Sequence, residues 1–271
     1  MTSPKVELKP CFLTPKRLQP ALPLFVYLPG MDGTGQLLRS QTAGLEAGFD
    51  VRCLAIPRDD LTSWDALSDN VLDLIHAELE KSACREVYLC GESFGGCLAQ
   101  KVALKAPKLF KRIVLINSAS AFHLRPLLSW ASQLTSLVPS CLYDLGGLVL
   151  LPFLANLPRI SRTDRHELVK TIRYVPPQTV LWRISLLREF SIDEAQLRSL
   201  TQPVLVIAGS QDKLLPSLEE ATRLTNLLPN AKMLVLPNCG HACLLEADIN
   251  LYEIMREQNF LSPSVPMVEA H

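Results

Sequence analysis

Short apolar runs alternate with segments of helical periodicity along most of this chain, and this alternation constrains its fold more than any other feature. The first run is Leu24-Phe-Val-Tyr-Leu28, which stops at a Pro-Gly pair. Further runs cover residues 51–55, 86–90, 112–117, 203–208 and 232–236. Strands that alternate with helices pair in parallel, because each helix returns the chain to the starting edge of the sheet. The sequence therefore predicts an α/β fold with a mostly parallel central sheet flanked by helices.

Helices are expected in the connections between these runs. Ser63 can cap a helix from Trp64 to about Lys81, because its hydroxyl can accept a hydrogen bond from a free backbone N–H of the first turn. Pro107 ends a helix that begins after residue 93. Two more helices are expected, at 36–46 and 248–256.

Residues 119–200 interrupt the alternation. They contain helical stretches such as 127–137 and 180–189 but no convincing strand. A segment of this length is too long for a simple connection between two strands. We therefore expect an N-terminal segment (1–20), an α/β core (21–118 and 201–261), a helical cap inserted into the core (119–200) and a flexible tail (262–271).

A Gly-x-Ser-x-Gly pattern occupies residues 91–95, between an apolar run and a helical segment. A strand that turns sharply into a helix exposes the residue at the bend, at the carboxyl end of the sheet. Gly91 and Gly95 leave the space that this crowded turn needs, and Ser93 lies at its tip. The alternative interpretation is a glycine-rich turn with an inert serine. In its strand–turn–helix setting, the motif predicts an α/β-hydrolase fold with Ser93 as nucleophile.

Two later residues would complete the catalytic set. Asp212 follows the apolar run at 203–208, and His241 follows the last run. The order serine, aspartate, histidine is the order of this fold. His241 would accept the proton of Ser93, and Asp212 would orient the imidazole. Asp212 could instead cap the helix that starts near Pro216.

The other histidines are weaker candidates for the base, and of these only His123 could line the mouth of the site; the others are His76, His166 and His271. Cys239 and Cys243 alternate with His241, as metal ligands sometimes do. No second Cys/His cluster completes a set of four ligands, so neither a metal site nor a cofactor is predicted.

The turn after the first apolar run has the sequence Gly30-Met31-Asp32-Gly33. In this fold such a turn supplies one oxyanion donor, and the residue after the nucleophile supplies the other. The predicted donors are the backbone N–H groups of Met31 and Phe94, and Gly30 would allow the substrate to approach closely. Asp32 places a negative charge beside this site, so we expect its side chain to bond its own loop. A phosphate-binding turn is the alternative, but its characteristic Gly-Lys ending is missing.

Four blocks of sequence resemble the α/β-hydrolase portion of the plant and cyanobacterial phytyl ester synthase (esterase/lipase/thioesterase-like) family. They lie at 28–33, 91–98, 208–216 and 238–246. The resemblance implies acyl transfer from a lipid donor to an alcohol such as phytol, or hydrolysis of such esters. Plant members of the family carry an acyltransferase domain after the hydrolase domain. This chain has none within its 271 residues, so hydrolysis is the expected activity.

The predicted cap is rich in large apolar residues. Trp130, Phe153 and Trp182 are candidates to line an apolar substrate pocket, and ordinary packing of the cap is the alternative. Lys+Arg and Asp+Glu both number 27, so no global field would attract nucleic acid. The chain shows no signal peptide, and no apolar stretch reaches the ~20 residues of a spanning helix. A cytoplasmic protein is expected; transient membrane contact and the oligomeric state stay open.

Three functions follow from these observations. The first is a serine hydrolase that cleaves small-molecule or lipid-like carboxylic esters through an acyl-enzyme. The second is an acyltransferase that passes the same acyl group to a long-chain alcohol. The third is a non-catalytic binding protein on a hydrolase scaffold.

Overall fold

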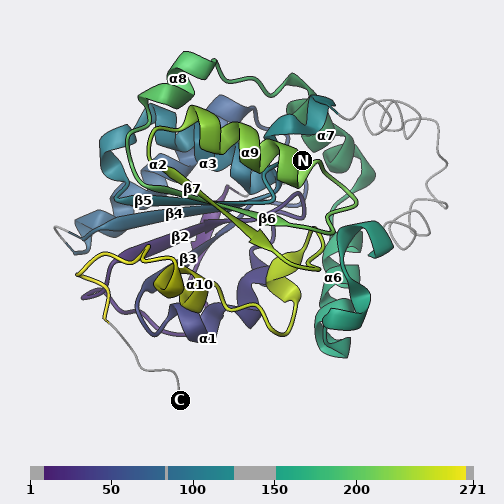
Figure 1. Cartoon of the computed structure of the whole chain (residues 1–271), viewed down its shortest axis with the longest axis horizontal. Helices are drawn as coiled ribbons and strands as arrows, with labels where there is room; N and C mark the ends of the chain where they lie inside the picture. Colours follow the sequence, from purple (N-terminus) through teal and green to yellow (C-terminus); the bar gives the residue numbers. More distant parts are fainter. Residues whose placement is uncertain (1–8, 83–84, 125–150, 267–271) are drawn as a thin grey trace, which may run out of the picture.

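A computed structural model describes residues 9–82, 85–124 and 151–266 of the chain. Its centre is a seven-stranded sheet with the order β1-β3-β2-β4-β5-β6-β7 (Figure 1). The strands are β1 (Cys11–Leu13), β2 (Leu24–Leu28), β3 (Asp50–Ala55), β4 (Val87–Glu92), β5 (Arg112–Ile116), β6 (Val204–Gly209) and β7 (Ala231–Leu236). All neighbouring pairs are parallel except β1 with β3. The predicted α/β-hydrolase fold class, with a mostly parallel sheet, is confirmed.

Helices cover both faces of the sheet (Figure 1). On one face, apolar side chains of α2, α3, α8 and α9 pack against β2, β4, β5 and β6. On the other face, α1 and α10 cover a second apolar layer. These α-helices are α1 (Thr42–Leu45), α2 (Trp64–Glu80), α3 (Phe94–Lys105), α8 (Glu194–Ser199), α9 (Ser217–Leu227) and α10 (Leu251–Glu257). Because β2, β4 and β5 are buried on both faces, they read in the sequence as unbroken apolar runs.

The described part of 119–200 is helical and contributes no strand to the sheet. Its α-helices are α6 (Arg162–Tyr174) and α7 (Pro177–Glu189) in addition to α8, and residues 151–154 form a further helical turn. Short 3₁₀ helices also occur, at η1 (Gln36–Ser40), η2 (Pro107–Leu109), η3 (Ala119–Leu124), η5 (Leu157–Arg159) and η6 (Cys243–Leu245). The helix expected at 127–137 lies outside the described residues. No helix in the described ranges is long and apolar enough to cross a membrane.

Three local expectations differ from the structure. The single helix expected at 36–46 is instead η1 followed by α1, with Gln41 between them. The N-terminal segment contributes an edge strand, β1, which pairs with β3. Residues 262–266 do not form a free tail, because Ser262 and Val265 are buried against the core and the Tyr252 hydroxyl donates to the carbonyl of Pro266.

A buried ionic cluster lies at the amino end of β3. Asp50 is fully buried and pairs with Arg52 at 2.8 Å and with Arg85 at 2.6 Å. Arg52 also pairs with Glu78. Burial alone would raise the pKa of Asp50, but hydrogen bonds from Arg52, the Gln19 amide and Arg85 outweigh it and lower the pKa. The ionised carboxylate is therefore the form that the fold stabilises.

We expect Asp50→Asn to lower the free energy of unfolding by about 3 kcal/mol at pH 7, because it removes the carboxylate that pairs with buried Arg85 and leaves buried Arg52 with Glu78 alone. A carboxyl whose folded pKa is depressed contributes stability above its unfolded pKa and loses it as pH falls through the folded value. The difference in unfolding free energy between the variant and the parent, measured by urea titration, should therefore become smaller below about pH 4. The matched control is Asp69→Asn, an exposed partner of Lys105, which should cost under about 1 kcal/mol. Equal losses for both variants would contradict this account.

Candidate active site

The turn between β4 and α3 holds Ser93 in a strained conformation. Its φ is 54° and its ψ is −114°, a region that residues with a side chain rarely adopt. The backbone N–H of Ser93 donates to the carbonyl of Ile116 on β5, which fixes the bend to the sheet. A Cβ at position 91 would lie 2.2 Å from the Gly95 oxygen, and one at position 95 would lie 2.0 Å from the Leu28 oxygen. Both glycines are therefore required by the close approach of strand and helix.

Ser93, His241 and Asp212 meet at the carboxyl end of the sheet. The Ser93 Oγ lies 2.9 Å from Nε2 of His241, and Nδ1 of His241 lies 2.7 Å from Oδ2 of Asp212. Asp212 sits in the loop after β6 and His241 in the loop after β7. The structure thus joins into one chain of hydrogen bonds three residues that the sequence places far apart.

The charges in this hydrogen-bond chain favour a basic imidazole. Burial alone would lower the pKa of His241, but the Asp212 carboxylate and the nearby Glu92 outweigh it and raise the pKa. Burial alone would raise the pKa of Asp212, but His241, Ser217 and the Leu215 amide outweigh it and lower the pKa. The ionised Asp212 carboxylate accepts a hydrogen bond from the Nδ1–H group of His241, so the lone pair of Nε2 faces the serine hydroxyl.

Asn117 ties the two loops together, and the sequence analysis did not single it out. It follows β5 with a φ of 43°, and its side chain is buried. Its Oδ1 accepts from the Gly209 N–H at 2.8 Å, and its Nδ2 donates to the backbone carbonyl of His241 at 2.6 Å. One carboxamide therefore sets the spacing between the end of β6, which leads to Asp212, and the loop that carries His241.

The segment at 154–159 braces the histidine loop from outside. The backbone N–H of Ala242 donates to the Leu154 carbonyl at 2.7 Å. Glu246 is buried, accepts from the Gly240 N–H at 2.8 Å and pairs with Arg159. The loop is thus held on both sides, by Asn117 from the core and by this segment from 119–200.

The turn after β2 lies against Ser93. A Cβ at position 30 would lie 3.8 Å from the Cβ of Ser93, and the Gly33 N–H closes the turn on the Gly30 carbonyl at 3.0 Å. Asp32 bonds its own loop, because its Oδ2 accepts from the backbone N–H of Thr34 at 2.9 Å and from the Thr34 hydroxyl. Burial nevertheless raises the pKa of Asp32. Phe94 is the first residue of α3, where a backbone N–H has no partner within its helix.

Another buried carboxyl lies next to Ser93. Glu92 precedes Ser93 and accepts a hydrogen bond from the hydroxyl of Tyr27. Burial raises the pKa of Glu92 to about 7, although the Tyr27 hydrogen bond and His241 act in the opposite direction. In the Gly-x-Ser-x-Gly pattern this position is variable, so the sequence motif does not identify it. Its charge therefore changes near neutral pH, within the electrostatic reach of His241.

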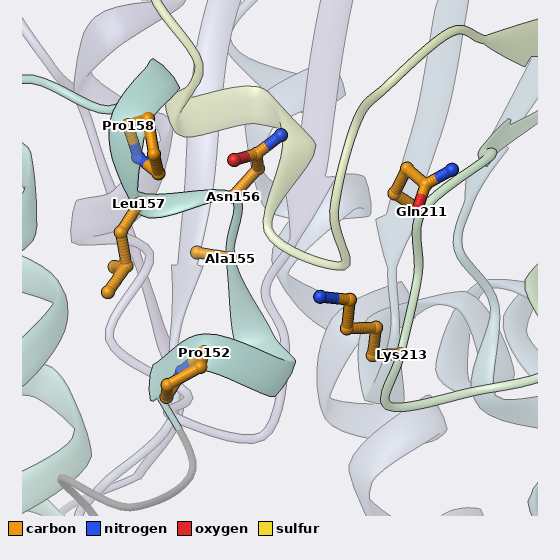
Figure 2. Close-up of a pocket in the computed structure, with 7 residues that line it drawn as sticks. All are labelled: Pro152, Ala155, Asn156, Leu157, Pro158, Gln211 and Lys213. Atoms are coloured by element: carbon orange, nitrogen blue, oxygen red, sulfur yellow. The ribbon is translucent and has the colours of Figure 1, made fainter.

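A hollow of about 230 Å³ lies between the segment at 152–158 and the loop after β6 (Figure 2). Its lining comes from two segments: Pro152, Ala155, Asn156, Leu157 and Pro158 on one side, and Gln211 and Lys213 on the other. Figure 2 shows the Lys213 amine extending toward the segment that carries Ala155. Gln211 and Lys213 flank Asp212 in the chain, but Ser93, His241 and Asp212 are not among the residues that line the hollow.

The other predicted site residues are placed as follows. Trp182 is half-buried on α7, where its indole N–H donates to the Thr62 carbonyl at 2.9 Å. Phe153 is 47% exposed, and Trp130 lies outside the described residues. His76 and His166 are exposed on helices away from Ser93, and His271 is outside the described residues. In the ranges that the structure covers, no cluster of His, Cys, Asp or Glu could hold a metal ion.

The sequence of this chain matches a known protein family and several characterised proteins. Residues 55–248 match the model of the alpha/beta hydrolase fold family, and the chain belongs to it. Phytyl ester synthase 1, chloroplastic, from Arabidopsis thaliana is 34% identical over 256 residues, which cover 86% of this chain and 36% of that protein. The resemblance inferred from the four sequence blocks is therefore confirmed. The chain spans little more than a third of the length of the two phytyl ester synthases that it matches.

Two shorter proteins are similar over more of their own length. Pimeloyl-(acyl-carrier protein) methyl ester esterase from Nitrosomonas europaea is 30% identical over 197 residues, which cover 69% of this chain and 77% of that protein. Among solved structures, MenH from S. aureus matches with a TM-score of 0.73 at 17% identity, covering 93% of this chain and 99% of that one. The relatives make this chain a hydrolase-family protein with esterase-type homologues, and the structural match shows the fold.

Proposed function

We propose that this protein is a serine hydrolase that cleaves carboxylic esters through an acyl-enzyme. The Ser93 hydroxyl attacks the ester carbonyl while Nε2 of His241 takes its proton. The Asp212 carboxylate stabilises the imidazolium that forms. His241 then gives the proton to the departing alcohol, and water, activated by the same imidazole, releases the acid from Ser93. The observation that carries this proposal is the unbroken hydrogen-bond chain from Ser93 through His241 to Asp212.

The oxyanion of the tetrahedral intermediate would lie between the turn after β2 and the start of α3. The backbone N–H groups of Met31 and Phe94 are the proposed donors. Gly30 supports this placement, because a Cβ at this position would lie 3.8 Å from the Cβ of Ser93, so the turn faces the serine. The N-terminus of α3 also favours negative charge at this point.

The proposed substrates are small-molecule or lipid-like esters with an apolar acyl group. The helices of 119–200 would act as a cap, and Trp182 and Phe153 are its candidate contacts with substrate. Acyl transfer to a long-chain alcohol is a second candidate, because phytyl ester synthase 1 is similar over 86% of this chain. Both activities share the acyl-enzyme and differ only in what attacks it.

The experiment that tests the proposal forms an acyl-enzyme and follows its fate. Incubation with p-nitrophenyl esters should release p-nitrophenol, and mass spectrometry of the quenched protein should locate the acyl group on Ser93. Adding phytol at rising concentrations separates the two activities. A hydrolase yields free acid throughout, whereas a transferase yields phytyl ester in proportion to the alcohol. A protein that neither turns over these esters nor reacts with a fluorophosphonate at Ser93 would instead be a binding protein on a hydrolase scaffold.

A further inference from the structure

Arg183 is a buried arginine on α7 that points into the turn beside the nucleophile. Only 2% of the residue is exposed, and it is the largest of the fully buried side chains. Its Nη1 donates to the backbone carbonyl of Met31 at 2.7 Å, and its Nη2 donates to the carbonyl of Pro57 at 3.2 Å. No carboxylate pairs with this guanidinium in the part of the chain that the structure describes. Both of its hydrogen bonds go to backbone carbonyls of loop residues, so the guanidinium can hold these loops in place.

The turn is shaped to receive this side chain. A Cβ at position 33 would lie 2.7 Å from Nη1 of Arg183, so only glycine leaves room for the guanidinium there. Gly33 also has a φ of 68°, and its carbonyl accepts from the Ile56 N–H at 2.7 Å. The turn is thus held by β3 on one side and by Arg183 on the other.

The helix that carries Arg183, α7, is itself held against the core. The indole of Trp64 on α2 donates to the Leu186 carbonyl of α7 at 2.8 Å, and Leu186 and Leu187 are buried in the core. A guanidinium on such a helix is held in place by packing. Asp32, one residue beyond Met31, provides a negative charge that partly balances the cation without pairing with it, because its carboxylate bonds Thr34.

We infer that Arg183 is a positioning residue that holds the Met31 N–H in place to stabilise the oxyanion, so that a helix of the 119–200 segment completes the catalytic turn. This inference rests on the proposed function of Ser93. The bond to the Met31 carbonyl fixes the peptide that follows Met31, and the Gly30–Gly33 hydrogen bond fixes the one before it. Without the guanidinium the turn can rotate, and a displacement of about 1 Å at a catalytic group can cost about 100-fold in rate.

Three variants test this inference. Arg183→Met keeps the length of the side chain and removes every donor, and Arg183→Lys keeps a charge with fewer donors. The matched control is Arg39→Met. Arg39 also joins the core to the 119–200 segment, but its partner is the Asp164 carboxylate on α6, at 2.7 Å, and not the backbone of the turn. Turnover of a short p-nitrophenyl ester, the melting temperature and hydrogen exchange of the amides at 31–34 are measured for each.

We expect Arg183→Met to lower kcat by about 10- to 100-fold with KM changed by less than about threefold, since the lost interaction acts in the transition state. Arg183→Lys should lose less, and Arg39→Met should keep kcat within about twofold. The amides at 31–34 should exchange faster in Arg183→Met than in the parent or in Arg39→Met.

A raised KM with unchanged kcat would mean that Arg183 acts on the substrate, and it would overturn the inference. So would a folded Arg183→Met protein with parental kcat, or parental exchange at 31–34. The exchange measurement also separates the two proposals. If the unmodified protein hydrolyses no ester, the proposed function fails, while exchange still shows whether Arg183 holds the turn.

Discussion

Replacing Ser93 with alanine should lower kcat for ester hydrolysis by about 10⁴- to 10⁶-fold. Without the hydroxyl no acyl-enzyme can form, and His241 has no proton to accept. Water held in the same site would supply only the residual rate. The fold should be unaffected, because Ser93 bonds its neighbours through backbone groups and its hydroxyl contacts only His241 among the described residues. The measurement is steady-state hydrolysis of p-nitrophenyl esters together with fluorophosphonate labelling.

The control for this substitution is a serine that is buried elsewhere. Ser68 lies on α2 with no exposed surface, and its hydroxyl donates to the Trp64 carbonyl at 2.6 Å. Ser68→Ala should keep full activity and full labelling, with a loss of about 1 kcal/mol in unfolding free energy. If Ser93→Ala kept more than a hundredth of the parental turnover rate, Ser93 could not be the nucleophile.

The sheet could be predicted from the sequence because its central strands are buried on both faces. Burial on both faces favours continuous apolar runs, and the predicted runs match β2, β3, β4, β5 and β6 to within a few residues at each end. The run at 232–236 matches β7, an edge strand that is only partly buried. β1 gave no such signal. It is a three-residue edge strand that is partly exposed, and it lies in a segment rich in proline and lysine. Its pairing with β3 depends on tertiary contacts that local patterns do not record.

The residues that meet at the site could be predicted where local sequence and chain order identify them. Ser93 lies in a motif whose glycines are required by the bend, and Asp212 and His241 follow strands whose ends meet at one edge of the sheet. Asn117 and Arg183 have no local signature. Each acts by bonding backbone far away in the chain: Asn117 bonds Gly209 and His241, and Arg183 bonds Met31, 152 positions away.

The local sequence does not identify the role of Glu92 either, although this residue lies inside a recognisable motif. Its position in the Gly-x-Ser-x-Gly pattern is variable, and the sequence gives no reason to expect a pKa near 7 there. Burial raises this pKa, whereas the Tyr27 hydrogen bond and His241, which the fold brings close to Glu92, lower it. A turn motif therefore indicates which side chain is held at the bend, while the ionisation of the groups around it depends on the assembled structure.

Asp212→Asn is the second large prediction, and its effect follows from how the carboxylate is held. Oδ1 of Asp212 accepts from the backbone N–H groups of Leu214 and Leu215, at 2.8 and 3.0 Å. Oδ2 faces Nδ1 of His241 and also accepts from the Ser217 hydroxyl. In the variant, the two backbone donors keep the amide oxygen in the Oδ1 position. The NH₂ group must then face His241, and a donor there forces the imidazole proton onto Nε2.

An imidazole with its proton on Nε2 cannot accept the proton of Ser93. We therefore expect kcat to fall by about 10⁴-fold, while the melting temperature changes little. The pH profile should change as well. The base must be neutral to act, so activity rises as pH passes the pKa of His241, which the Asp212 carboxylate raises in the parent. Loss of the carboxylate removes that stabilisation of the imidazolium, so the acidic limb should move to lower pH and end on a much lower plateau.

Two variants separate this effect from a loss of local structure. Ser217→Ala removes the hydroxyl that shares Oδ2 but leaves the carboxylate, so its kcat should fall by less than about tenfold. Asp193→Asn changes an aspartate that caps α8, and it should keep both the rate and the pH limb. Since the acid acts only by orienting and stabilising His241, fluorophosphonate labelling of Asp212→Asn should slow in proportion to kcat. If Asp212→Asn kept more than a tenth of the parental kcat, or if its acidic limb stayed in place, another group would have to orient His241.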